Sequence, residues 1–501
     1  MGIVSFDTLL APELTPVDRT EETRRFPTAE VAIAVGTFAL FCVAVLTKAT
    51  KLLEPDDAAY KASIVALIHG HITLSTAQYN ALSAQLSAHG GMGIAQWVHL
   101  PDGRWISEKN PGYPFFAAPF QWLGILRAAP LFAGALASTS LFVAGRRWLG
   151  KWGGTWAVIF FLFSGAALAF AWRPTMPSFT DAALVATGAG ALLWTFLADD
   201  ASPRRRAVVG LLGFLSLEAA VFIRYTDVVM LLVAVVAVVL TFRRARIPAR
   251  SLIWWFSSLA LFAGVVMVFD QIFYGGAFKT GYGPGEITFS FGAIIPNLKL
   301  MPSYLVKAIP ALLLGFAALV WMAVRVLRNR SKATDPTSLS MHRRDGVVGL
   351  VLAAGWLGLW GLYSAYTWTA QTGPRSGAGG AIHIIRFYLP AIGLIALLGA
   401  WLLTQLPKWL PVAVVIVVAI LGFSSFRSLT AAGAAGFPGG VTGGFPGGAR
   451  NGAYPPPGFT GNLPKGVRPP PGGLTKGFKP GNGKLPPGFT PPRRSSAPGS
   501  Q

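Results

Sequence analysis

Two adjacent aspartates that follow the first long apolar stretch are the first side chains in this sequence that could do chemistry. They are Asp56 and Asp57, within Glu-Pro-Asp-Asp-Ala-Ala-Tyr, which ends at Tyr60. One carboxylate of such a pair could act as a general base or bind a divalent cation such as Mg²⁺ or Mn²⁺, while the second tunes it. Aspartate at the start of a helix also caps free N–H groups and complements the helix dipole. The spacing therefore allows a chemical role, a structural role or both.

A second polar element lies further along, where the chain reads Trp-Ile-Ser-Glu-Lys-Asn-Pro-Gly-Tyr-Pro from Trp105 to Pro114. Its proline and glycine residues predict a rigid turn. Lys109 would offer a positive charge to a phosphate at the depth of the lipid headgroups. Alternatively, Glu108 and Lys109 form a solvated pair at the end of a loop, and the aromatic residues belong to the belt at a membrane interface.

Apolar stretches must position these residues, because they dominate the chain. Hydrophobic residues make up 53% of the 501 residues and charged residues 12%, whereas a soluble domain carries about a quarter charged residues. Stretches near the length needed to cross a bilayer recur throughout. We therefore expect an all-α integral membrane protein, a polytopic bundle of about 11 transmembrane helices. The spans are expected at 29–52, 128–145, 154–172, 179–198, 207–223, 227–242, 252–273, 304–326, 346–366, 387–405 and 410–424.

The basic residues predict how this bundle is oriented. The net charge is +22, but the basic residues form short clusters between apolar stretches rather than one basic face, which argues against nucleic-acid binding. Every second connection is short and basic, and by the positive-inside rule these connections face the cytoplasm. They contain Arg146, Arg147 and Lys151; Arg204 to Arg206; Arg243 to Arg250; Arg325 to Arg344; and Lys408. The outer face then carries the loops 53–127, 274–303 and 367–386.

Three regions follow along the chain: a cytoplasmic N-terminal segment (1–28), the transmembrane domain (29–425) and a tail (426–501). The tail is basic, rich in glycine and proline and free of acidic residues, so we expect it to be disordered. A cytoplasmic N-terminus and an odd number of spans place it outside the cell. Abundant alanine, glycine, arginine and proline are typical of a GC-rich bacterial genome, so the expected location is a bacterial plasma membrane.

Taken in order, these elements resemble the GT-C glycosyltransferase superfamily, and most of all its protein mannosyltransferase and aminoarabinose transferase branch, which is glycosyltransferase family 39-like. The resemblance begins with the Asp-Asp pair and the element that contains Lys109. Three further stretches fit the same family: Phe222–Thr226 with Arg224, Phe273–Tyr282 with Lys279, and Ile385–Pro390 with Arg386. It covers roughly residues 30–425. Asp57 departs from the family pattern, in which a second glutamate is frequent, and so does Asn110, which separates Lys109 from the proline.

The resemblance implies a glycosyltransferase that moves a monosaccharide from a polyprenyl-phosphate-linked donor to an envelope glycan, lipid or protein. Transfer would occur on the extracytoplasmic side by direct, inverting attack. Asp56 would be the base, with Asp57 beside it. The donor phosphate would be bound by Lys109, Arg224, Lys279 and Arg386. Substrate-positioning roles would fall to Tyr60, Glu108, Tyr113 and Tyr282.

Two other classes of protein share part of this pattern. Transporters and lipid-linked sugar flippases also have many spans and a few intramembrane charges. This sequence lacks an obvious internal repeat, and its polar residues gather in outer loops rather than at helix centres, which favours the enzyme. A non-catalytic scaffold that binds wall polymer through its basic tail would not need Asp56 or Asp57. The arginines would then be interfacial anchors.

Overall fold

The computed structural model describes residues 28–47, 55–88, 93–243, 245–282, 287–329, 336–372, 384–407 and 409–434. Nearly all of the predicted cytoplasmic segment (residues 1–27) and most of the predicted tail (residues 435–501) lie outside this part of the chain. The described residues form helices and one two-stranded antiparallel hairpin. The prediction of an all-α polytopic membrane protein is confirmed.

Within the described residues, eight helices contain a stretch long and apolar enough to cross a bilayer. They are α2 (Thr28–Leu46), α6 (Ala128–Leu149), α9 (Ser178–Leu197), α10 (Pro203–Ile223), α12 (Ala249–Tyr274), α14 (Ala311–Asn329), α15 (Pro336–Ser364) and α19 (Leu410–Ala434). The pair α7 (Gly153–Leu162) and α8 (Gly165–Ala171) is apolar and long enough only when taken together, and it is bent by 59°, as in a broken span or a re-entrant loop. Two shorter apolar helices are η1 with α11 (Tyr225–Asp227 and Val228–Thr241) and η3 with α18 (Leu389–Ala391 and Ile392–Leu403). Each predicted span therefore has a helical counterpart.

Several predicted boundaries are wrong. The span expected at 304–326 begins inside a separate helix, α13 (Phe291–Ala308), which occupies much of the predicted loop 274–303. α14 starts only at Ala311, because Pro310 cannot continue a helix. α19 runs to Ala434, so the predicted tail begins inside it. α2 ends at Leu46, before the predicted end at residue 52.

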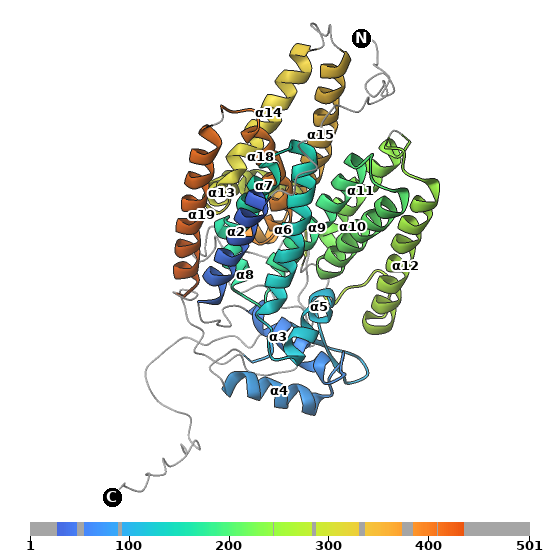
Figure 1. Ribbon diagram of the computed structural model, residues 1–501. Coiled ribbons are helices and arrows are strands. Elements are labelled where there is room, and N and C mark those ends of the chain that lie inside the picture. The colour runs from blue at the N-terminus through green and yellow to red at the C-terminus, as the bar shows by residue number, and fades with distance from the viewer. Residues whose placement is uncertain are drawn as a thin grey trace, which may run out of the picture. The chain divides into compact units, whose positions relative to one another are not determined.

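The predicted first outer loop has a fold of its own. It contains α3 (Pro55–Ile68), α4 (Thr76–Ala88), strands β1 (Trp97–His99) and β2 (Trp105–Ser107), and α5 (Gly112–Trp122). A small apolar cluster that includes Leu74 and Trp97 packs α3 against the hairpin. Figure 1 shows α3, α4 and α5 together at one end of the bundle, whereas the end of α14 and the start of α15 lie at the other end.

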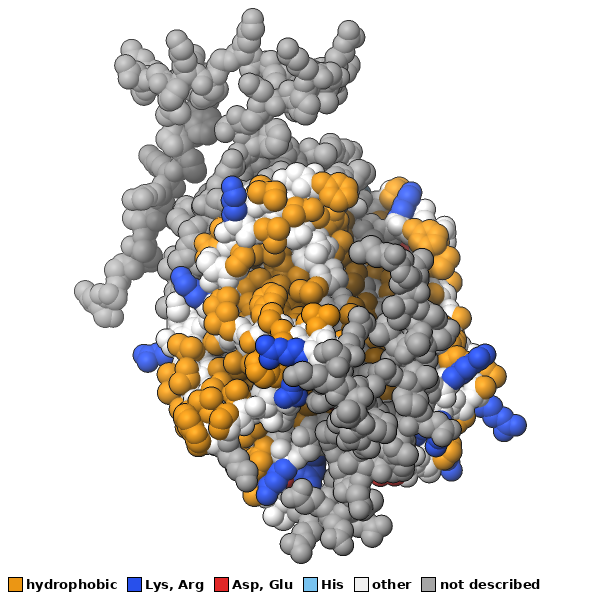
Figure 2. Space-filling model, turned by 90° about the horizontal axis from the view of Figure 1, so that it is seen from above, with side chains coloured by type: hydrophobic (Ala, Val, Ile, Leu, Met, Phe, Trp, Pro, Cys, Tyr) orange, Lys and Arg blue, Asp and Glu red, His pale blue; other side chains and the backbone are white. Residues whose placement is uncertain are grey.

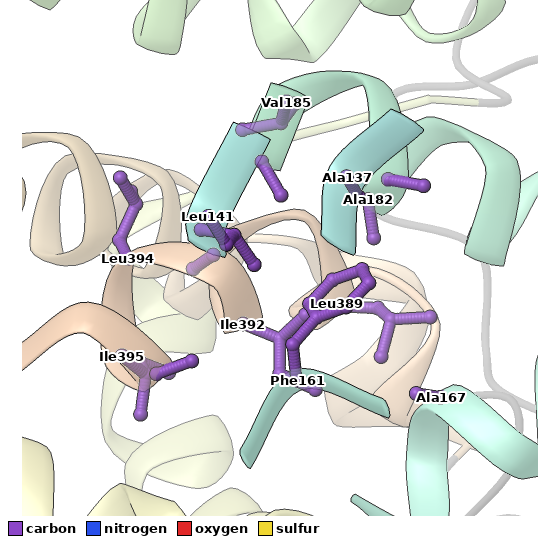
Figure 3. Packing of buried hydrophobic residues seen from close by; sticks show 14 of the residues in the cluster. Ala137, Leu141, Phe161, Ala167, Ala182, Val185, Leu389, Ile392, Leu394 and Ile395 are labelled. Carbon is purple, nitrogen blue, oxygen red and sulfur yellow. The ribbon is translucent and has the colours of Figure 1, made fainter. Parts of the chain in front are cut away.

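α6 and α9 pack closely in the core because small residues line their contact. A Cβ added to Gly190 would lie 2.6 Å from the Ser140 hydroxyl oxygen, so a larger residue would push the helices apart. Ser140 donates a 2.7 Å hydrogen bond to the Thr187 carbonyl oxygen and thereby joins the two helices. Small residues and interhelical hydrogen bonds are the usual means by which helices associate in lipid. Apolar side chains from α6, α7, α9 and α18 fill the surrounding core (Figure 3).

The bend between α7 and α8 has a local cause. Ser164 caps α8 by accepting a 3.0 Å hydrogen bond from the Ala167 N–H, so the helix restarts in a new direction. α8 then ends at Ala171, and the segment before α9 turns toward α3. This segment contains Arg173 and Thr175.

Successive spans alternate in direction, which gathers the polar elements at one end. The starts of α9 and α18 and the ends of α10 and α12 lie at the end that carries α3 to α5 (Figure 1). Figure 2 views the opposite end, where lysine and arginine side chains stand both near the middle and at the edge of the face, and acidic side chains scarcely show. The side of the membrane that each end faces stays a prediction.

Candidate functional site

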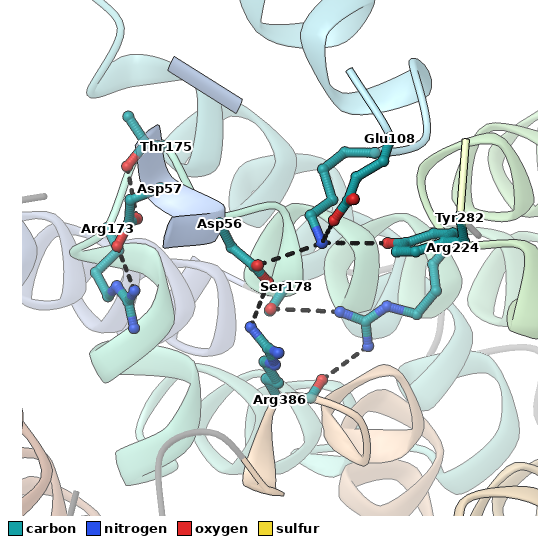
Figure 4. A network of polar contacts seen from close by, with 10 residues as sticks. Asp56, Asp57, Glu108, Arg173, Thr175, Ser178, Arg224, Tyr282 and Arg386 are labelled. Carbon is teal, nitrogen blue, oxygen red and sulfur yellow. Dashed lines mark hydrogen bonds and ion pairs between the residues drawn. The ribbon is translucent and has the colours of Figure 1, made fainter. Parts of the chain in front are cut away.

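Asp56 is held between two cations at the start of α3. Pro55 is the first residue of this helix, a position that suits its fixed φ, and Asp56 follows in the first turn, where a carboxylate complements the helix dipole. Arg386 donates a 2.5 Å hydrogen bond to one carboxylate oxygen, and the Lys109 ammonium lies 3.3 Å from the other. The first loop and the turn before η3 therefore meet at this carboxylate (Figure 4).

The charges of this cluster determine its protonation. Burial alone would raise the pKa of Asp56, but the positive charges of Lys109 and Arg386 outweigh it and hold that pKa well below its usual range. Burial likewise would lower the pKa of Lys109, but nearby groups, with Asp56 foremost, raise it well above its ordinary value. In the absence of substrate the cluster therefore holds an ionised carboxylate and an ionised ammonium.

Glu108 and Tyr282 complete the polar surroundings of Lys109. The ammonium lies 3.2 Å from the Glu108 carboxylate, donates a 3.4 Å hydrogen bond to the Tyr282 hydroxyl, and lies 4.9 Å from the centre of that ring. A Cβ on Gly281 would lie 2.4 Å from the Glu108 Cα, so glycine allows the loop after α12 to approach this closely. The Lys-Thr-Gly-Tyr sequence thus brings Tyr282, rather than Lys279, into the cluster.

Arg224 joins the cluster to the bundle. It follows the last residue of α10 and donates a 2.8 Å hydrogen bond to the Arg386 carbonyl oxygen and a 3.4 Å hydrogen bond to the Ser178 hydroxyl. Its Nε lies 3.4 Å from the Asp181 carboxylate. The guanidinium therefore fixes the turn that carries Arg386 and brings a third positive charge to the same end of the protein.

Asp57 faces a different environment from Asp56. Its carboxylate pairs with Arg173 and accepts a 2.7 Å hydrogen bond from the Thr175 hydroxyl. The Asp57 side chain is 0% exposed, whereas that of Asp56 is 16% exposed. A substrate could thus reach Asp56 but not Asp57 without rearrangement. The contacts of Asp57 are those of a residue that ties α3 to the segment between α8 and α9 (Figure 4).

We expect Asp57→Ala to destabilise the protein, because it leaves the buried Arg173 guanidinium without this carboxylate. Breaking a buried ion pair costs about 3–5 kcal/mol. Thermal unfolding of the purified protein in detergent would measure the loss. The double substitution Asp57→Ala/Arg173→Met should recover much of the lost stability, since it removes the buried positive charge together with the carboxylate. An Asp57→Ala protein of unchanged stability that had lost activity would instead support a catalytic role.

The remaining predicted positions lie at different distances from the cluster. Tyr60 is adjacent to it: burial, together with the nearby Tyr282 and Asp56, raises its pKa, although Lys109 and Arg224 act in the opposite direction. Tyr113 is fully buried, packs edge-on against Tyr60 at 5.8 Å, and donates a 2.5 Å hydrogen bond to the Pro174 carbonyl oxygen. Lys279 is exposed, and no hydrogen bond or ion pair within the described residues joins it to the cluster.

Sequence reasoning missed several residues around the site. Gln96 donates a hydrogen bond to Asp56 and adopts a φ of 56°, which is uncommon for a residue other than glycine. No sequence signal marks it. Asp181 and Arg173, in contrast, are charged residues next to or within apolar stretches, and the cost of burying charge in a membrane could have identified them.

The acidic pair does not suit a Mg²⁺ or Mn²⁺ site. Such ions need several oxygen ligands, but both aspartates already face arginine or lysine side chains, and Figure 4 shows them directed to different partners. Among the described residues, no group of three or more histidine, cysteine, aspartate or glutamate side chains could hold a metal ion. We therefore derive no step through a metal.

The fold and this cluster define a polytopic membrane protein with a partly buried, highly charged site at one end of its helices. No protein-family model matches the chain, and no curated protein sequence matches it either.

Two kinds of solved structure are similar to it. One is the archaeal oligosaccharyltransferase AglB from Archaeoglobus fulgidus, in complex with an inhibitory peptide and a dolichol-phosphate. It is 11% identical with a TM-score of 0.48, and the match covers 81% of this chain and 56% of that chain. Another is ArnT from Cupriavidus metallidurans bound to undecaprenyl phosphate, at 16% identity and a TM-score of 0.32, covering 75% and 77%. This chain thus spans little more than half of the AglB chain.

Proposed function

We propose that this protein is a membrane glycosyltransferase that transfers a monosaccharide from a polyprenyl-phosphate-linked donor to an acceptor of the bacterial cell envelope. The acceptor is a glycan, a lipid or a protein on the extracytoplasmic side. The single observation that supports this most strongly is Asp56, a partly accessible carboxylate between Lys109 and Arg386. A base next to two phosphate-binding cations is what sugar transfer from a phosphate requires.

The same contacts lower the basicity of Asp56 before the donor binds. A carboxylate whose pKa is held far below its usual range is a weak base. A donor phosphate that binds Lys109 and Arg386 would share their positive charge, and the pKa of Asp56 would then rise toward its ordinary value. Binding of the donor phosphate would thus activate the base.

The transfer step follows from these positions. Asp56 accepts the proton of an acceptor hydroxyl while the hydroxyl oxygen attacks the anomeric carbon. A new glycosidic bond forms as the bond between the anomeric carbon and the phosphate oxygen breaks, which inverts the anomeric centre. The lipid phosphate departs with the bonding electron pair, and Lys109, Arg386 and Arg224 stabilise its negative charge.

Incubation of the purified protein with radiolabelled polyprenyl phosphate sugars and an envelope extract tests the function. We expect label to move from the lipid to a product of the extract. Movement of the lipid-linked sugar across a vesicle bilayer without transfer would indicate a flippase. Binding to wall polymer without turnover would indicate a scaffold.

The pH dependence of transfer tests the lowered basicity of Asp56. Because a base works only when it is deprotonated, activity falls as the pH drops through its pKa. We expect the acid limb of kcat/KM, which reports the free enzyme, to lie at lower pH than the acid limb of kcat, which reports the donor complex. Lys109→Met removes one cation and should move the limb of kcat/KM to higher pH.

Lys109→Arg is the matched control for this experiment, since it keeps the positive charge. It should leave the limb of kcat/KM near its original pH, even if the rate falls. Coincident limbs for kcat and kcat/KM in the unsubstituted protein would contradict an activation of Asp56 by the donor.

A further inference from the structure

A second pair of carboxyl groups lies behind Arg224, and the transfer mechanism does not use it. Asp181 is in the first turn of α9 and Asp227 in η1, and their side chains are 0% and 1% exposed. The two carboxyl groups lie within hydrogen-bonding reach of each other. Within the described residues, no donor gives either of them a hydrogen bond. The cation that the described part of the chain places beside them is Arg224, whose Nε lies 3.4 Å from Asp181.

Two buried carboxylates that face each other cannot both stay ionised at low cost. Like charges at this range repel strongly away from water, and buried oxygen atoms that accept no hydrogen bond cost free energy. A single proton between the two groups removes the repulsion and supplies the missing hydrogen bond. The described residues offer these oxygen atoms no other hydrogen-bond donor. The geometry therefore favours one proton between the two carboxyl groups.

The contact with Arg224 indicates where the proton lies. A carboxylate paired with a guanidinium gains most by staying ionised, and Asp181 is the member of the pair that contacts Arg224. Asp227, the residue directly before α11, would then carry the proton and donate a hydrogen bond to Asp181. Tyr363 on α15 also faces the pair, and its hydroxyl shares a 2.5 Å hydrogen bond with Thr226.

The charge balance of the whole cluster supports this assignment. The cluster contains four carboxyl groups and three cations, which are Asp56, Glu108, Asp181 and Asp227 against Lys109, Arg224 and Arg386. With one proton on the aspartate pair, three negative charges meet three positive charges. A buried cluster is most stable when its charges balance.

We propose that Asp181 and Asp227 share one proton and act as positioning residues that hold Arg224 with its positive charge only partly neutralised. This inference rests on the proposed function in one respect, the assignment of Arg224 to the donor phosphate. Asp181, Ser178 and the Arg386 carbonyl fix the guanidinium. Because Asp227 is neutral, the negative charge of one carboxylate, rather than two, offsets the charge of the guanidinium. The guanidinium of Arg224 therefore attracts a phosphate more strongly.

Infrared spectroscopy of the full-length protein in lipid, recorded as the difference between each variant and the unsubstituted protein, tests for the shared proton without any substrate. A protonated carboxyl group gives a C=O stretching band that a carboxylate lacks. We expect Asp227→Asn and Asp227→Ala each to remove one component of this band. Glu218→Gln is the matched control, because Glu218 is also a buried acid, accepting a hydrogen bond from Ser258 on α12, but lies apart from the pair. It should leave that component in place. A folded Asp227→Asn protein with an unchanged band would overturn the proposal.

Binding of a polyprenyl phosphate without sugar, followed by tryptophan fluorescence, tests the consequence for Arg224. Affinity should weaken at alkaline pH, when the shared proton leaves and a second carboxylate opposes Arg224, by roughly fivefold or more. Asp227→Asn cannot lose this proton and should lack that weakening. Persistence of the same alkaline limb in Asp227→Asn would contradict the role of the pair. Absence of phosphate-lipid binding at every pH would contradict the proposed function instead, while the infrared band would still decide whether the proton is present.

Discussion

Asp56→Asn is expected to reduce sugar transfer by roughly 10²- to 10⁴-fold, the usual contribution of a positioned general base. Asparagine keeps the size of the side chain and one oxygen that accepts a hydrogen bond, but it is neutral and cannot accept the proton of the acceptor hydroxyl. The loss should appear in kcat, because the carboxylate acts in the chemical step, and donor binding should not weaken, because Lys109 and Arg386 lose the carboxylate that shares their charge. Transfer of label from a polyprenyl phosphate sugar, measured under single-turnover conditions, gives this rate directly.

Two comparisons make the Asp56 result specific. Asp57→Asn keeps the shape of the neighbouring buried side chain, and any loss of transfer that it causes should scale with its loss of stability. Asp56→Glu restores a carboxylate one methylene further out and should recover part of the activity. Equal rates of transfer for Asp56→Asn and the unsubstituted protein would exclude Asp56 as the base and require another group to accept the proton.

The order of the spans was predictable because lipid imposes a simple rule on sequence. A helix that crosses a bilayer must be apolar along its length, so composition alone locates it. α13 does not follow this rule, because Pro296 and Lys299 interrupt its apolar residues. Asn297 anchors it instead, through hydrogen bonds of 2.8 and 2.9 Å to the carbonyl oxygens of Ser364 and Tyr366. Such long-range contacts leave no periodic signal in the sequence.

The candidate site was predictable only in part, for a related reason. Asp56 and Lys109 were found as polar residues that could do chemistry beside apolar stretches, and the resemblance to the GT-C superfamily added Arg224 and Arg386. The different surroundings of Asp56 and Asp57 could not be predicted. Adjacent residues on a helix point about 100° apart, and what each meets depends on how the segment after α8 is placed. Arg173 in that segment meets Asp57, which leaves Asp56 for the cluster.

Arg386→Ala is expected to reduce kcat/KM by roughly 10²- to 10³-fold, which corresponds to about 3–4 kcal/mol. Two losses combine in this variant. Asp56 loses its 2.5 Å hydrogen bond and its orientation, and the departing phosphate loses a guanidinium. Arg386→Lys keeps the charge but not the planar fork of donors, so it should recover only part of the activity.

A double-substitution cycle with Asp56→Asn separates these two losses. If Arg386 served only to orient Asp56, then removing it would cost nothing further once the carboxylate was gone, and the double variant would match Asp56→Asn. We expect the double variant to be slower and to bind polyprenyl phosphate more weakly than Asp56→Asn alone, because the phosphate contact is lost in both backgrounds. Unchanged lipid affinity in Arg386→Ala would restrict this arginine to positioning the base. Lys109 and Arg224 would then be the phosphate ligands.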